Sequence, residues 1–343
     1  MATDATVPPF TMVSNGGITG LDINIVARFC EAYGYGLTVK NMSTDALVPA
    51  IQSGKADLIG SALSITPERE ESVLFCEPYC VADVVLVILK SDAVVEAAAG
   101  AETEEGGFLG GLWTSFQKTF IREARWKLFL KGLLTTLNIT ILSILIGTLL
   151  GFLIFMLCRN GNRVANGITR VGLWLLQGMP TVVLLMIFYY IIFGTLAVGG
   201  TVVAIICFTL IFATGVFALL KTGVGTVDPG QYEAAYALGY SNRRTFFKVI
   251  LPQALPHVVS TYKGEITGLL KASSVVGYIA VQDLTKMGDI VRSRTYEAFF
   301  PLIAVAIIYF GLEGILGFIV NRISRGLNPK RRTMEDVLKG VNQ

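Results

Sequence analysis

The chain has 343 residues, of which 53% are hydrophobic and only 15% are charged. This composition is too apolar for an ordinary soluble globular protein and predicts a membrane protein. The net charge of +3 is small and no run of Lys and Arg interleaves with aromatic residues, so nucleic acid is not an expected partner. The five cysteines lack metal-ligand spacing, which predicts packing residues and no metal site.

The N-terminal part, residues 1–127, holds most of the acidic side chains and no apolar run that could cross a bilayer. Helix-like and strand-like stretches alternate within it, which predicts a small α/β unit. Helices are expected over 23–33 and 46–53, and strands over 37–39, 56–59 and 84–89. The first 25 residues show no basic start followed by an apolar core, so no signal peptide is expected.

Two segments connect this unit to the apolar part of the chain. Residues 91–107 are small and acidic, which is typical of a linker. Residues 108–127 predict an amphipathic helix with Trp113, Phe116, Phe120 and Trp126 at the level of the lipid headgroups. Docking of this helix against the membrane helices is an equally good interpretation.

Five membrane spans are expected in the C-terminal part. Residues 132–157 are 26 uncharged residues, enough to cross about 30 Å of hydrocarbon with some tilt. Residues 171–220 carry no charge, and a Gly-rich interruption at 193–200 divides them into two further spans. The fourth and fifth spans are expected over 257–280 and 298–320.

The basic residues of the loops predict the orientation in the membrane. Arg159, Arg163 and Arg170 follow the first span without an acid, and five further Lys and Arg residues follow the last span. Because cytoplasmic loops carry an excess of Lys and Arg, both segments are expected inside the cell. The loop 221–256 and the C-terminus are then cytoplasmic, and the N-terminal region is extracytoplasmic.

The long cytoplasmic loop has the composition of two short helices, 232–240 and 242–250, separated by Gly239 and ended by Pro252. Such a hairpin presents an apolar ridge formed by Ala234, Ala235 and Leu238. An interfacial helix that lies on lipid is the alternative interpretation.

The spacing within this loop resembles the EAA signature of bacterial ABC importer permeases, EAA-x3-G-x9-I-x-L-P. The matching residues are Glu233, Ala234, Ala235, Gly239, Val249, Leu251 and Pro252, with Val in place of Ile. The resemblance implies that the loop is a coupling helix pair that docks on a separate ABC ATPase subunit. Small Ala side chains permit close approach, and Gly239 permits a sharp turn.

The resemblance extends from about residue 126 to residue 332, through stretches such as QGMPTVVLLMIFYY and GLLKASSVVGYIAVQDL, to the polar amino-acid uptake permeases. It implies a mainly α fold, a five-span helical ABC importer transmembrane domain that pairs with a second permease copy. The chain contains no Gly-x4-Gly-Lys-Ser/Thr motif, so it is expected to bind no cofactor and to leave ATP-Mg and its hydrolysis to the partner.

Residues 20–90 resemble the first lobe of the periplasmic binding proteins for polar amino acids, particularly in GLDINIVARFCEAYG and SALSITPERE. The resemblance implies ligand contacts from Asp4, Ser61, Ser64 and Arg69, with Arg69 on the substrate carboxylate, as suits a planar guanidinium. A solvated Arg69 beside its neighbouring acids is the alternative. No second lobe follows, so the chain is expected to be a fragment or a natural truncation of a binding-protein and permease fusion.

Three ionisable residues lie within the predicted fourth and fifth spans: Glu265, Lys271 and Glu313. Such residues are costly in a bilayer and usually face a cavity or a partner, which predicts a translocation pathway. An internal ion pair that fixes helix packing is the alternative. His257 is the only histidine and lies at the start of the fourth span.

The expected domains are a partial solute-binding domain (1–91), a linker with an interfacial helix (92–127), the permease domain (128–325) and a cytoplasmic tail (326–343). The expected function is a permease subunit of an ATP-driven importer for polar amino acids in the cell membrane, not an enzyme. The alternatives are a ligand-gated channel, because residues 275–279 contain a filter-like Val-Gly-Tyr, and a membrane receptor.

Overall fold

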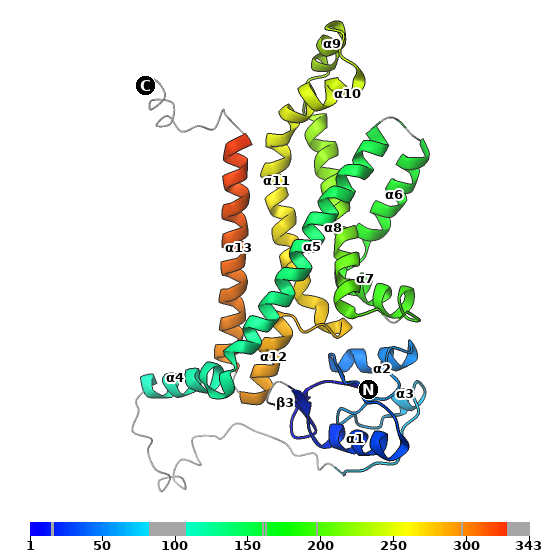
Figure 1. The fold of residues 1–343 in the computed structure, drawn as a ribbon, viewed down its shortest axis with the longest axis vertical. Coiled ribbons are helices and arrows are strands. Elements are labelled where there is room, and N and C mark those ends of the chain that lie inside the picture. Colours follow the sequence, from blue (N-terminus) through cyan, green and yellow to red (C-terminus); the bar gives the residue numbers. More distant parts are fainter. Residues whose placement is uncertain are drawn as a thin grey trace.

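The protein is mainly helical, with long helices running side by side, a small N-terminal region at one end and a short helical hairpin at the other (Figure 1). The computed structural model describes residues 1–14, 17–81, 108–159, 161, 163–196, 198–295 and 298–327. The predicted strand 84–89, the linker 91–107 and the tail from residue 328 lie outside the described residues.

The N-terminal region contains two small sheets and three helices. Strand β1 (Ala2–Thr3) pairs in parallel with β5 (Lys40–Asn41), and β2 (Thr6–Val7), β3 (Thr11–Ser14) and β4 (Gly17–Thr19) form an antiparallel sheet. The helices are α1 (Leu21–Tyr33), α2 (Thr44–Gln52) and α3 (Pro67–Glu70). The two predicted helices therefore form, as α1 and α2.

The predicted strands of this region fit less well. The strand expected over 37–39 begins only at Lys40, and the one expected over 56–59 contributes a single bridge from Ile59 to Ala2. Both segments pair with the two-residue strand β1, whose short length limits each ladder to one or two residue pairs. Ala2, Met42, Ala46 and Leu47 are fully buried in the small core between these strands and α2.

The predicted interfacial helix is broken into α4 (Phe108–Phe116), a π-helix η2 (Gln117–Ile121) and a 3-10 helix η3 (Arg122–Ala124). Glu123 and Ala124 have positive φ angles of 55° and 50°, which turn the chain into the first long helix. The ring of Phe116 lies 6.1 Å from that of Phe300, and Phe120 lies 5.6 Å from Phe129. One side of the segment thus docks on the membrane helices.

Three helices are long and apolar enough to cross a membrane: α5 (Trp126–Arg159), α8 (Gly200–Gly225) and α13 (Phe299–Leu327). A fourth candidate is a broken pair, α6 (Arg163–Gly178) with α7 (Thr181–Met186) and the π-helix η4 (Ile187–Ile192), which bends by 110° at the break. By length and composition, the described residues therefore hold three or four spans rather than the five expected.

The second expected span departs most from the prediction. It was expected as one length up to residue 192, but the chain breaks at Met179 and Pro180, between α6 and α7. Proline lacks the N–H of a helix interior and disfavours a helical residue before it, which explains the break. The predicted interruption at 193–200 does separate η4 from α8.

The fourth expected span corresponds to α11 (Leu251–Ala272) and the 3-10 helix η6 (Ser273–Ile279). It is not among the candidate spans by length and composition, and it carries Lys263, Glu265 and Lys271. A further helix, α12 (Leu284–Thr295), was not predicted and lies near the N-terminal region (Figure 1).

The main core forms around α8, where Cys207, Phe208 and Phe212 are almost completely buried. Helix α5 approaches α8 closely at Gly151, which has no side chain. A Cβ added there would lie only 2.6 Å from the carbonyl oxygen of Ala213. Small residues at such contacts let helix backbones pack tightly in membranes. Among the cysteines, Cys158 and Cys207 are buried as expected, but Cys76 and Cys80 are exposed, so the packing prediction is wrong for that pair.

Candidate functional site

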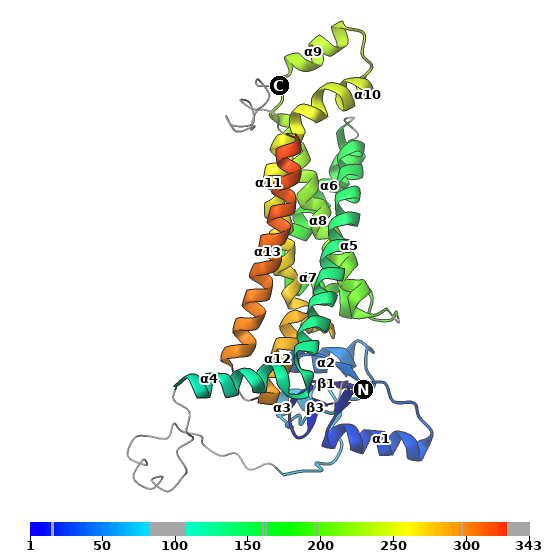
Figure 2. The same ribbon diagram turned by 60° about the vertical axis from the view of Figure 1, so that its left-hand side comes forward.

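The segment expected to contact the ATPase forms a helical hairpin, residues 230–250, at the end of the molecule opposite the N-terminal region (Figures 1 and 2). We call it the coupling hairpin. It comprises α9 (Gly230–Ala237), α10 (Asn242–Thr245) and the π-helix η5 (Phe246–Ile250). Gly239 between its helices has φ +77°, a left-handed conformation that favours glycine.

The second half of the coupling hairpin is anchored to α5. Phe246 and Ile250 are fully buried, and the ring of Phe155 lies 6.0 Å from that of Phe246. The guanidinium of Arg159 lies 4.1 Å from the Phe246 ring centroid and donates hydrogen bonds to the side chain of Asn242 and, at 3.1 Å, to its carbonyl oxygen. The hairpin is therefore held rigidly at the end of the helix bundle.

The residues of the EAA signature divide between an inner and an outer face. Ala235 is buried, and Val249 and Leu251 pack against the main core. Glu233 and Ala234 are exposed, next to Leu238, which is 77% exposed. The prediction of an apolar ridge is therefore wrong for Ala235, which faces inward.

The prediction that Pro252 ends the second helix of the hairpin is wrong. Pro252 is the second residue of α11, which follows η5 directly, and Ile250 and Leu251 before it both have right-handed helical backbone angles. The chain therefore passes from η5 into α11 without leaving a helical path.

At the opposite end, Asp4 bonds to the permease part of the chain. Its Oδ1 accepts hydrogen bonds from Lys286 Nζ at 3.0 Å and Thr6 Oγ1 at 2.8 Å, and its Oδ2 accepts from Thr44 N and Oγ1, both at 2.9 Å. Burial raises the pKa of Asp4, but the ammonium of Lys286 and these hydrogen bonds outweigh it and hold the pKa below its ordinary value. The carboxylate that was predicted to contact substrate is occupied within the protein.

The other predicted ligand residues form two groups. Ser61 is buried and its Oγ accepts a hydrogen bond from the backbone N–H of Asp4 at 2.9 Å. Ser64 is exposed, and Arg69 donates from Nη1 to its carbonyl oxygen at 2.9 Å. In the part of the chain that the structure describes, Arg69 forms no ion pair with Glu70 or Glu71.

Further contacts join the N-terminal region to the helices, and sequence reasoning missed them. The buried Lys55 donates to the carbonyl oxygens of Phe193 and, at 2.8 Å, Leu196. Tyr190 donates to the carbonyl oxygen of Ala46 at 3.3 Å. The sequence around Lys55 gives little indication of these contacts. A lone cation after a predicted helix does not show that its partner lies 138 residues away.

The ionisable residues of the fourth and fifth expected spans differ in their contacts. Lys271 on α11 pairs with Glu313 on α13 at 3.5 Å, which agrees with the ion-pair interpretation of these two residues. Glu265 lies against α8, where a Cβ added at Gly215 would collide with its carboxylate. Among the described residues, Glu265 has no hydrogen-bond or ion-pair partner.

Comparison with known proteins identifies the class. The family model of the bacterial extracellular solute-binding proteins, family 3, matches residues 1–323. The arginine transport system permease protein ArtQ of Bacillus subtilis (strain 168) is 31% identical over 208 residues, which cover 58% of this chain and 91% of ArtQ. The putative glutamine transport system permease protein GlnP of Rickettsia prowazekii (strain Madrid E) is 30% identical over 200 residues, with 57% and 91% covered.

Two solved structures resemble the fold. The crystal structure of an amino acid ABC transporter with histidines has 28% identity and a TM-score of 0.55, and the match covers 60% of this chain and 97% of that one. An inward facing conformation of the MetNI methionine ABC transporter has 20% identity and a TM-score of 0.50, with 59% and 96% covered, and supports the fold alone.

The chain therefore belongs to the bacterial extracellular solute-binding proteins of family 3 and, in its membrane part, to the amino-acid ABC transporter permeases. It is a multi-pass membrane protein and a permease subunit of an ABC importer, and the channel and receptor alternatives are not favoured. Residues 275–279, which suggested a filter, lie within the 3-10 helix η6.

Proposed function

We propose that the chain imports polar amino acids and is driven by a separate ATPase that docks on the coupling hairpin. The exposed Glu233, Ala234 and Leu238 at the end of the bundle carry this proposal, because they form a compact surface on a rigidly anchored element. ATP-Mg and its hydrolysis belong to the partner. The amino-acid substrate is inferred from relatives whose names specify glutamine and arginine transport.

The mechanism proposed is alternating access. Closure of the ATPase subunits displaces the coupling hairpin, and α11 follows because it continues from η5 without a break in the helical path. A second permease copy, identical or related, completes the pathway. Glu265 lines that pathway, and the ion pair of Lys271 and Glu313 lies beside it.

The proposed topology has five spans, in which α11 with η6 crosses the membrane despite its charges. The coupling hairpin and the C-terminus are then cytoplasmic, and the N-terminal region is extracytoplasmic. Arg159, Arg163 and Arg170 support this orientation, because they cluster where α5 turns into α6, at the coupling-hairpin end (Figure 1).

The proposed domain boundaries remain a partial solute-binding lobe (1–91), a linker with the docked helix (92–127), the permease (128–325) and a cytoplasmic tail (326–343). Within the lobe, Arg69 and Ser64 are the proposed substrate contacts, since Arg69 uses only Nη1 in its bond to the Ser64 backbone. Asp4 and Ser61 support the lobe rather than contact substrate, because they bond to each other, and Asp4 also bonds to Lys286.

Co-purification of the ATPase subunit with the tagged full-length chain tests the proposal. Glu233→Lys places the wrong charge on the exposed face, and Gly239→Pro imposes φ near −65° where the turn needs +77°. Both variants are expected to lose the ATPase. Glu31→Lys, the same charge reversal on the exposed face of α1, is the control and retains it. Equal recovery of the ATPase with all three variants would remove the hairpin from the interface.

A further inference from the structure

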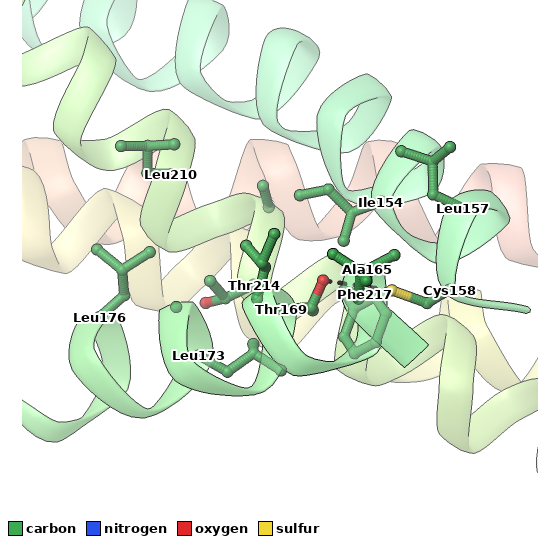
Figure 3. Close-up of a pocket in the computed structure, with 14 residues that line it drawn as sticks. Ile154, Leu157, Cys158, Ala165, Thr169, Leu173, Leu176, Leu210, Thr214 and Phe217 are labelled. Atoms are coloured by element: carbon green, nitrogen blue, oxygen red, sulfur yellow. Dashed lines mark hydrogen bonds between the residues drawn. The ribbon is translucent and has the colours of Figure 1, made fainter. Parts of the chain in front are cut away.

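Two adjoining cavities lie between α5, α6 and α8, outside the proposed transport and coupling sites. The first has a volume of about 490 Å³ and is lined almost entirely by apolar side chains of the three helices (Figure 3). The second, of about 400 Å³, adjoins it toward the α5–α6 turn. Thr169, Leu173 and Phe217 line both cavities, so the two lie directly next to each other, and we call them together the groove.

The first cavity is chemically suited to a hydrocarbon chain. The hydroxyl of Thr214 donates to the carbonyl oxygen of Ile211 at 2.7 Å, and that of Thr169 lies 3.2 Å from the sulfur of Cys158. The polar atoms in the wall are therefore already satisfied. At the rim, Val164 and Ile168 are 69% and 70% exposed, so the cavity opens sideways where a membrane protein faces lipid.

The second cavity is chemically suited to an anion. Arg163, Arg170 and Lys221 line it, and no acidic side chain does. None of the three cations has an ion-pair partner in the described part of the chain. They lie where α5 turns into α6 and where α8 approaches α9, which is the coupling-hairpin end of the bundle (Figure 1).

We propose that this groove is a binding site for one anionic phospholipid, with an acyl chain in the apolar cavity and the phosphate among Arg163, Arg170 and Lys221. Basic pockets between transmembrane helices at the cytoplasmic side suit anionic lipid headgroups. A free phosphate would leave the adjoining apolar cavity empty, and a zwitterionic lipid would leave the three cations uncompensated. This lipid site goes beyond the proposed function. It rests on the proposed topology only for placing the three cations at the cytoplasmic leaflet.

Two variants test the two halves of the groove separately. Arg163→Gln with Arg170→Gln removes two of the cations, and Lys127→Gln with Lys131→Gln removes two cations from the opposite end of α5 as a control. Gly172→Leu places a side chain on the wall of the apolar cavity, where a Cβ at Gly172 meets nothing within 4 Å, and Gly311→Leu is the matched control on α13.

Native mass spectrometry of the full-length chain, titrated with phosphatidylglycerol or phosphatidylcholine of identical acyl chains, gives the readout. Wild type is expected to retain one phosphatidylglycerol, about 100-fold more tightly than phosphatidylcholine, since each of the three cations near the anionic headgroup contributes about fivefold in affinity. The double Arg variant keeps only Lys221 and is expected to prefer phosphatidylglycerol by about fivefold. Gly172→Leu is expected to weaken both lipids, and the controls are expected to match wild type.

Three outcomes would overturn the proposal. Equal retention of the two lipids by wild type would show that the cations do not select the headgroup. Displacement of the bound lipid by inorganic phosphate alone would show a simple anion site. Loss of the dimer in Gly172→Leu with unchanged lipid binding, seen in the same spectra, would make the groove a contact between two copies of the chain.

Discussion

At the scale of the residue, the partly buried Glu265 and the buried Lys286 show how differently two charged side chains can be used. Lys286 is paired with Asp4 at 3.0 Å and both side chains are 8% exposed, so this ammonium is committed to holding two regions together. Glu265 lies against the Gly215 backbone with no partner among the described residues. An unpaired carboxylate within a span is a candidate for contact with a substrate or a partner subunit.

Glu265→Gln is accordingly expected to lower substrate uptake about tenfold while leaving the amount of folded protein in the membrane unchanged. The reason is that the amide keeps the size of the side chain but removes its charge. Uptake of labelled amino acid into proteoliposomes that contain the ATPase measures the effect. Thr261→Ala on the same helix is the control, because the Thr261 hydroxyl bonds only to backbone carbonyls of α11. Unchanged uptake and selectivity in Glu265→Gln would exclude the residue from the pathway.

At the scale of the element, α12 depends on the cap that Asp283 provides. The fully buried carboxylate of Asp283 accepts hydrogen bonds from the N–H groups of Thr285 at 3.0 Å and Lys286 at 3.1 Å. A side-chain acceptor at this position satisfies the first N–H groups of the helix. Burial raises the pKa of Asp283 to about 6, against the opposing effect of these hydrogen bonds.

The pH dependence follows from this raised pKa. A carboxyl whose pKa is higher in the folded than in the unfolded protein contributes stability that is complete below the unfolded value, 3.8, and is lost as the pH rises through about 6. Asp283→Asn cannot ionise, so the Tm of wild type relative to this variant is expected to fall between pH 4 and pH 7. Thermal unfolding in detergent at several pH values measures it.

Asp283→Ala serves as the second variant. It removes the acceptor altogether and is expected to destabilise the protein by about 1 kcal/mol at pH 7 relative to Asp283→Asn. A Tm difference between wild type and Asp283→Asn that does not change with pH would contradict the proposed cost of burying the charge.

At the scale of the whole molecule, the N-terminal region is fixed by separate polar contacts to the end of the helices opposite the coupling hairpin. Lys286 bonds to Asp4, Lys55 bonds to Phe193 and Leu196, and Tyr190 bonds to Ala46. Ala5 and Val13 also pack against Met287 and Ile290 of α12. The region therefore behaves as a docked part of the permease rather than as a tethered lobe.

Lys286→Met is expected to release this docking at neutral pH, because it leaves the buried Asp4 without its counter-charge. Faster hydrogen exchange of β1 and α2 measures the release, and Lys131→Met, an exposed cation on α5, is the control. Wild-type docking is expected to be complete above pH 3.8 and to weaken as the pH falls through the lower folded pKa of Asp4. Unchanged exchange in Lys286→Met would show that the apolar contacts suffice.

The sequence by itself determined the apolar helices, the helices α1 and α2, and the turn at Gly239, because each depends on residues close together in the chain. It did not reveal the bend at Pro180 within an uncharged stretch, since the same composition also suits a straight span. Only the tertiary structure decided that Asp4 pairs with Lys286, 282 residues away, and that Ala235 faces inward. Long-range pairing depends on which helix faces meet, and local composition does not encode that.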